Sequence, residues 1–130
     1  MRLFSKAPKP GSPADRKAAL ALVPVILDSV SQSDGPNGVI RLHFAVSPGR
    51  IATLLGNGSP VMRTLELDEM GSATWAFIDG KRSVADIAQQ LAQQYKLLPK
   101  EAEMSVSIFM RELGRRGLIA LREPQPRQSS

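Results

Sequence analysis

Cysteine and histidine, which often act as nucleophiles, bases and metal ligands, are almost absent from this 130-residue sequence. The sequence has no cysteine and one histidine, His43. A nucleophilic hydrolase needs a serine or cysteine beside a histidine or an equivalent base, and a zinc site needs several cysteine or histidine ligands. Because His43 lies on the polar side of an alternating run, we interpret it as a surface or edge-strand residue. We therefore expect no catalytic residue, no metal and no cofactor.

The carboxylates and glycines also have structural explanations. Glu66, Asp68 and Glu69 lie where a strand is predicted to end and a helix to begin, so capping and solvation account for them. Neither of the phosphate-binding patterns GxGxxG and GxxxxGK[ST] occurs in the sequence. The segments 56–58 and 79–82 are typical of turns. We expect that the protein is not an enzyme.

The composition predicts one small globular domain. Hydrophobic residues make up 42% of the chain, which is enough for one core at this length. No apolar run approaches the roughly 20 residues that cross a bilayer, and the N-terminus lacks the apolar stretch of a secretion signal. With no cysteine available for disulfides, we expect a cytoplasmic protein with no membrane partner.

The positive charge is concentrated at the two ends of the sequence. The net charge is +5, but residues 21–121 hold ten basic and ten acidic residues and are neutral overall. Residues 1–19 and 122–130 are rich in proline and charge and have little to bury, so we predict that both are disordered. The folded domain is expected over residues 20–121.

Three strands are predicted in the first half of this domain. The run 23–33 is rich in β-branched residues, and 39–46 alternates between apolar and polar side chains. The turn-forming residues at 34–38 between them predict a hairpin. Residues 61–67 alternate again, with Met62, Thr64 and Glu66 on one face. Within the intervening segment 47–60, residues 51–55 fit either a short strand or a helical turn.

Three helices are predicted in the second half. Asp68 is a candidate N-cap for the first helix, and Asp79-Gly80 would end it. Ser83 with Asp86 resembles a capping box at the start of the second. The third begins near Pro99, with Gly117 as the C′ residue after its end, and residues 118–121 would close the domain as a short strand or a docked tail. The predicted fold class is α+β and winged-helix-like, with three N-terminal strands followed by a three-helix bundle.

A winged-helix DNA-binding transcriptional regulator is the alternative that this order leaves open. The second and third predicted helices resemble a helix-turn-helix pair, and Arg115 and Arg116 lie near the end of the third. However, the start of that helix, which would meet the bases, carries Glu101 and Glu103. Since the predicted body is also neutral, we do not expect nucleic acid as a partner.

Peptide binding fits the sequence better. The strand 61–67 leads directly into the helices, and an uncovered outer strand can accept an extended peptide as an additional strand. The third helix would flank that edge and form the other wall of a groove. Arg63, Arg111 and Arg115 would offer bidentate donors to acidic side chains of the peptide.

Residues 61–121 also resemble a known family. The matching pattern is a strand, then L-D-x-x-G-x-x-x-W-x-x-I-D-G, then [ST]-V-x-x-I-A-x-x-L, then F-x-x-x-L-x-x-x-G-L-I. These motifs are similar to those of the PqqD family, and the matching positions here are Leu67, Asp68, Gly71, Trp75, Ile78, Asp79, Gly80, Ser83, Val84, Ile87, Ala88, Leu91, Phe109, Leu113, Gly117, Leu118 and Ile119.

The resemblance implies a RiPP recognition element, in this case a divergent standalone one. In that family the domain binds the leader of a ribosomally made precursor peptide as an added strand, between the third strand and the third helix. It presents the peptide to a modifying enzyme, typically a radical SAM protein, as in pyrroloquinoline quinone (PQQ) biosynthesis. Carried over to this sequence, the peptide-binding residues would be Met62, Arg63, Thr64, Leu65, Ile108, Arg111, Glu112 and Arg115.

Overall fold

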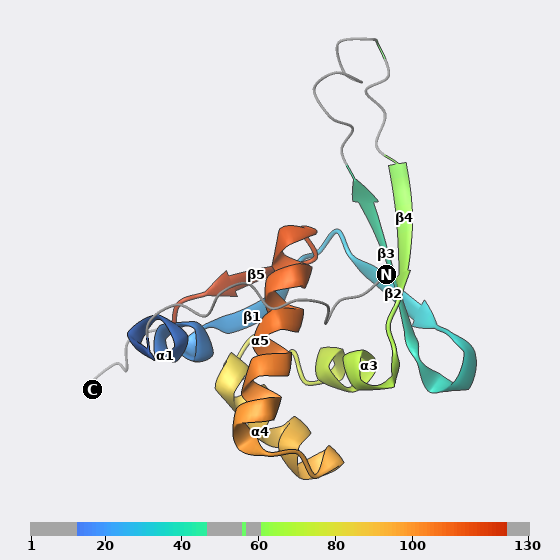
Figure 1. Cartoon of the computed structure of the whole chain (residues 1–130). Coiled ribbons are helices and arrows are strands. Elements are labelled where there is room, and N and C mark those ends of the chain that lie inside the picture. The colour runs from blue at the N-terminus through green and yellow to red at the C-terminus, as the bar shows by residue number, and fades with distance from the viewer. Residues whose placement is uncertain (1–12, 47–55, 57–60, 125–130) are drawn as a thin grey trace. The chain divides into compact units, whose positions relative to one another are not determined.

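The computed structural model describes residues 13–46, 56 and 61–124 (Figure 1). In the part of the chain that it describes, the fold is a mixed α/β fold with four α-helices and two small antiparallel sheets. The chain divides into two compact units, one formed by Met1–Leu27 with Ala73–Ser130 and the other by Asp28–Ser72.

The unit Asp28–Ser72 contains a three-stranded antiparallel sheet. Its strands β2 (Ser31–Asp34), β3 (Ile40–Val46) and β4 (Val61–Glu66) lie in the order β2-β3-β4 (Figure 1). The predicted hairpin around residues 34–38 is confirmed, because β2 and β3 pair across a turn that includes the 3₁₀ helix η1 (Pro36–Gly38). Asn37 and Gly38 have φ values of 58° and 79°, a conformation that these two residue types adopt readily.

The sheet has one apolar and one polar face, as the alternation predicts. Leu42, Phe44 and Leu65 are buried on one face, and Leu67, just after β4, is buried as well. Arg41, His43 and Thr64 lie on the other face, where they make side-chain hydrogen bonds. Because the side-chain period of a strand is two, the buried leucines and phenylalanine fix the register of the strands.

Helix α3 (Glu69–Ala76) begins in this unit and continues into the other. The predicted cap is confirmed, since the Asp68 Oδ1 atom accepts a hydrogen bond from the Gly71 N–H at 2.6 Å. The Ser72 hydroxyl accepts from the Ile40 N–H at 2.9 Å and so ties the start of this helix to β3.

The other unit holds helices α1 (Pro13–Ala21), α4 (Val84–Tyr95) and α5 (Pro99–Arg115). The capping box of α4 is present: the Ser83 hydroxyl accepts from the Asp86 N–H, and the Asp86 carboxylate accepts from the Ser83 N–H. Helix α5 ends at Arg115, and Gly117 follows its C-terminus as predicted, with a φ of +75° and the Leu118 N–H donating to the Leu113 carbonyl. The apolar stripes of the two helices pack together around Ile87, Ala88, Leu91, Ala102, Val106, Phe109, Met110 and Leu113.

A two-stranded sheet completes this unit. Strand β1 (Val23–Ile26) pairs antiparallel with β5 (Ile119–Arg122), and α5 packs against β5 (Figure 1). The closing strand predicted over residues 118–121 is thus confirmed, although it is shifted by one residue to Ile119–Arg122. None of the helices in the described ranges is both long and apolar enough to cross a membrane.

The predicted element count needs two corrections. The run 23–33 is not one strand: β1 and β2 are separated by a turn at Asp28-Ser29 and belong to different sheets. Helix α1 occupies residues 13–21, where we predicted disorder as far as residue 19. Its alanines favour a helix, and contacts with α4 and α5 stabilise it. The described chain therefore has four strands before α3 and a helix before all of them.

Three predictions fall on residues outside this description. They are the disorder of residues 1–12, the strand or helical turn at 51–55, and the disorder of residues 125–130. The predicted C-terminal tail begins at residue 122, but Arg122 is the last residue of β5.

Candidate functional site

Strand β4 is an edge strand of its sheet. It pairs with β3 on one side, and no described residue pairs with its other side. At six residues, β4 is also longer than the opposite edge strand, β2, which has four residues and ends two residues before Pro36. Proline provides no N–H for pairing, so β2 offers the shorter row of free groups.

The register of β4 shows which of its backbone groups face outward. The Leu67 N–H donates to the Ile40 carbonyl at 2.9 Å, so the ladder bonds connect the pairs Leu42–Leu65, Phe44–Arg63 and Val46–Val61 in alternation. The residues between them turn their N–H and C=O groups away from β3. These residues are Met62, Thr64 and Glu66. They form a row of three donors and three acceptors along the edge, which we call the β4 edge.

The four strand residues predicted to bind peptide differ in exposure. Met62 is 67% exposed, and Arg63 and Thr64 are exposed as well. Leu65 is 7% exposed and lies opposite the fully buried Leu42. The Leu65 side chain is therefore part of the apolar core, and its backbone groups face β3 rather than the outer side.

A hydrogen-bonded row of polar side chains crosses the sheet beside the β4 edge. The His43 ring lies between two hydroxyls, with Nε2 2.7 Å from Ser33 Oγ and Nδ1 3.1 Å from Thr64 Oγ1. The Arg41 Nε donates to Glu66 Oε1 at 3.0 Å. These contacts connect all three strands, so the only histidine of the sequence has a structural explanation. They also use the side chains of Thr64 and Glu66, but not their outward backbone groups.

The Arg63 side chain differs from these because it forms no hydrogen bond or ion pair with the described part of the chain. Its side chain lies on the apolar face, opposite Phe44, with Val61 and Leu65 as its neighbours along the strand. An exposed guanidinium next to apolar neighbours can bind a carboxylate with little competition.

The four predicted residues of α5 lie on its more accessible side. Arg111 and Arg115 are exposed, whereas Ile108 and Glu112 are half-buried. Arg115 Nη1 donates to Glu112 Oε1 at 3.1 Å, so this arginine already has a carboxylate partner. Arg111, unlike Arg115, has no ion pair among the residues described. Since β4 and α5 belong to different units, the groove between them stays a prediction.

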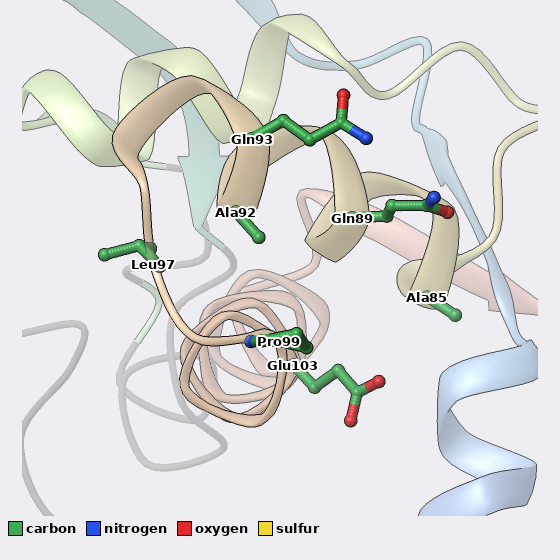
Figure 2. Close-up of a pocket in the computed structure, with 7 residues that line it drawn as sticks. All are labelled: Ala85, Gln89, Ala92, Gln93, Leu97, Pro99 and Glu103. Atoms are coloured by element: carbon green, nitrogen blue, oxygen red, sulfur yellow. The ribbon is translucent and has the colours of Figure 1, made fainter.

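A shallow hollow of about 530 Å³ lies elsewhere, between α4 and α5 (Figure 2). Its lining is Ala85, Gln89, Ala92, Gln93, Leu97, Pro99 and Glu103. Figure 2 shows the two glutamines on α4 and Glu103 on α5. One carboxylate among amides and small apolar groups provides no nucleophile with a base. Across residues 13–46, 56 and 61–124, no group of three or more His, Cys, Asp or Glu side chains is placed to hold a metal ion.

Glu66 is the residue of the β4 edge that our sequence interpretation missed. We assigned it to the end of a strand, where capping and solvation would explain its carboxylate. The sequence nevertheless indicated this position, because Glu66 lies on the same face of the alternating run as Met62 and Thr64.

The comparisons with known proteins agree with this fold. The family model for coenzyme PQQ synthesis protein D (PqqD) matches residues 47–119, which is more than half of the chain and begins upstream of the motifs that suggested the resemblance. No curated protein matches the sequence.

A solved structure is similar as well. It is the solution NMR structure of the PqqD truncation of PqqCD from Methylobacterium extorquens, described as a functional, stand-alone RiPP recognition element. The two chains are 21% identical, and the match covers 75% of this chain and 88% of that one with a TM-score of 0.53. At this identity the likeness concerns the fold, and neither comparison supports a DNA-binding protein. Because the family model covers more than half of the chain, the chain belongs to the PqqD family.

Proposed function

We propose that this protein is a non-catalytic adaptor that binds the leader of a ribosomally made precursor peptide. The peptide would add to the β4 edge as a further strand, and the adaptor would present it to a modifying enzyme of the radical SAM type. The observation that carries the proposal is the β4 edge itself, in a chain of the PqqD family.

The backbone of the β4 edge supports strand addition. Met62, Thr64 and Glu66 offer three N–H and three C=O groups to a guest strand. Each hydrogen bond formed in water contributes a net ~0.5–1.5 kcal/mol, so a few such bonds give useful affinity for any extended peptide. Sequence preference must then come from side chains next to the edge.

The side chains along this edge fit a ligand that binds as an extended strand. Met62 and Arg63 are exposed, one on each face, so alternate side chains of a guest would meet different neighbours. The relative that is described as a RiPP recognition element supports a leader peptide as the ligand. The partner enzyme follows from the family resemblance alone. We extend the proposal to α5, where Ile108, Arg111, Glu112 and Arg115 would contact the same peptide.

The direct test is a titration of the ¹⁵N-labelled full chain with the leader half of a short precursor peptide encoded beside this gene. A peptide of the same composition in scrambled order is the control. We expect saturable shifts at the amides of β4 with the leader, and clearly weaker binding of the scrambled peptide at the same amides. Shifts confined to β2, or no response to the leader together with tight and strongly salt-dependent binding to duplex DNA, would contradict the proposal.

A further inference from the structure

We infer that the peptide bound at the β4 edge carries an acidic residue flanked by apolar residues two positions away on each side. The pattern is apolar-x-(Asp or Glu)-x-apolar, centred on Arg63. This inference rests on the proposed function and adds the chemical class of the ligand.

The centre of the pattern follows from the unpaired state of Arg63. Arg41, Arg82 and Arg115 each have a carboxylate within 3.6 Å, but Arg63 has none among the described residues. A guest residue beside Arg63 shares its face of the sheet, where opposite charges on neighbouring strands attract and like charges repel. If the guest runs antiparallel, Arg63 also falls at a non-hydrogen-bonded pair, where side chains approach most closely.

The flanks of the pattern follow from the neighbours of Arg63 along β4. Val61 is 49% exposed and Leu65 is 7% exposed, and both lie on the same face as Arg63. A guest side chain beside Val61 would meet its exposed apolar surface, and one beside Leu65 would lie at the margin of the apolar core, so both positions favour apolar or β-branched residues. The pattern reads the same in both directions, so it does not depend on whether the guest is parallel or antiparallel.

The opposite face of the edge selects less strongly. Thr64 is hydrogen-bonded to His43, and Glu66 is ion-paired with Arg41, so neither has an unused side-chain group of comparable strength. Met62 is exposed and flexible, and a methionine accepts many apolar partners. Specificity is therefore expected mainly on the Arg63 face.

The test is a selection from a display library of random twelve-residue peptides against three forms of the full chain. These are the wild type, Arg63→Glu and the charge-matched control Lys100→Glu, which changes an exposed residue in the first turn of α5. Glutamate is compatible with a helix N-terminus, so the control should fold normally. Circular dichroism and thermal unfolding of all three forms verify their folding.

We expect wild type and Lys100→Glu to enrich an acidic residue at the centre of the pattern. Arg63→Glu should enrich lysine or arginine there and keep the apolar flanks. For a synthetic pair that differs only by Glu or Lys at the centre, wild type should prefer the Glu peptide about three- to tenfold, and Arg63→Glu should reverse the preference. The preference should weaken as salt is raised.

Two kinds of failure can be told apart. If selected peptides shift the β4 amides but show no acidic centre, or if Lys100→Glu changes the selection as Arg63→Glu does, the inference is wrong and strand addition stands. If no peptide is enriched, or if enriched peptides shift amides outside β4, the proposed function itself fails.

Discussion

The substitution Met62→Pro tests peptide binding at the β4 edge independently of the stability of the fold. The Met62 N–H faces away from β3, and its side chain is 67% exposed, so Met62→Pro removes one outward donor and little else. Edge strands tolerate proline where the missing N–H would face solvent. We expect the free energy of unfolding to change by less than about 1 kcal/mol, because no internal hydrogen bond is lost.

Peptide affinity should respond more strongly than stability. One backbone hydrogen bond is worth about 0.5–1.5 kcal/mol net, so Met62→Pro should weaken binding about three- to tenfold. Met62→Ala keeps the N–H and is the control for the side chain. The assay is calorimetric or fluorescence titration with one leader peptide, alongside urea unfolding of each variant.

Arg63→Pro is the second control, since its N–H faces β3 and pairs with Phe44. It should destabilise the sheet by about 1–3 kcal/mol, because it leaves a ladder carbonyl unsatisfied. A folded Met62→Pro variant that binds the leader as tightly as Met62→Ala would refute the assignment of the outward groups. Equal destabilisation by the two prolines would refute the register.

Substitutions at four further positions test the fold of the unit that contains α4 and α5. Leu91→Ala truncates a side chain that is 1% exposed and should lower the free energy of unfolding by about 2–5 kcal/mol in urea titrations, whereas the exposed neighbour Gln90→Ala should change it by less than about 0.5 kcal/mol. Ser83→Ala removes the cap of α4 and should cost about 1 kcal/mol, with Ser83→Asp retaining most of it; equal losses would contradict the capping box. Gly117→Ala places a side chain at a φ of +75° and should cost about 1–2 kcal/mol, even though no neighbouring atom would clash. Hydrogen bonds from the N–H groups of Arg82 and Lys81 lower the pKa of Asp79 below its usual 3.8. The contribution of the ionised Asp79 to stability is therefore present above pH 3.8 and is lost as the pH falls further. In urea titrations from pH 6 to pH 2.5, the free energy of unfolding should fall less for Asp79→Asn than for wild type.

Local patterns in the sequence predicted the elements that depend on local physics. Ser83 with Asp86, Asp68 before α3 and Gly117 after α5 are recognisable because each satisfies backbone groups within a few residues. The alternation around Leu65 likewise separated the two faces of β4, and Leu65 is buried on one of them. These signals need no knowledge of the rest of the chain.

The elements that were missed depend on distant contacts. The pairing of Val23 with Arg122 joins residues at opposite ends of the chain, and nothing in the run 23–33 marks where one sheet ends and another begins. The residues of α1 were predicted to be disordered from their local composition. The helix is stabilised by packing against α4 and α5, and the local sequence does not reveal those contacts.

The candidate site was predictable only in part. Alternation in the sequence indicates the two faces of β4 but not which N–H groups face outward, since that depends on the pairing with β3. The register with β3 was needed to see that the backbone groups of Glu66 face outward, and the ion pairs were needed to see that the Arg63 side chain has no carboxylate partner among the described residues.

Amide hydrogen exchange of β4, with and without a bound leader peptide, tests the central claim most directly. In the free protein, the amides of Arg63 and Leu65 should exchange slowly and those of Met62, Thr64 and Glu66 quickly. Bound peptide should slow exchange at these three residues and leave the alternate positions little changed. Unchanged exchange at Met62, Thr64 and Glu66 in a saturated complex would show that the peptide does not add to this edge.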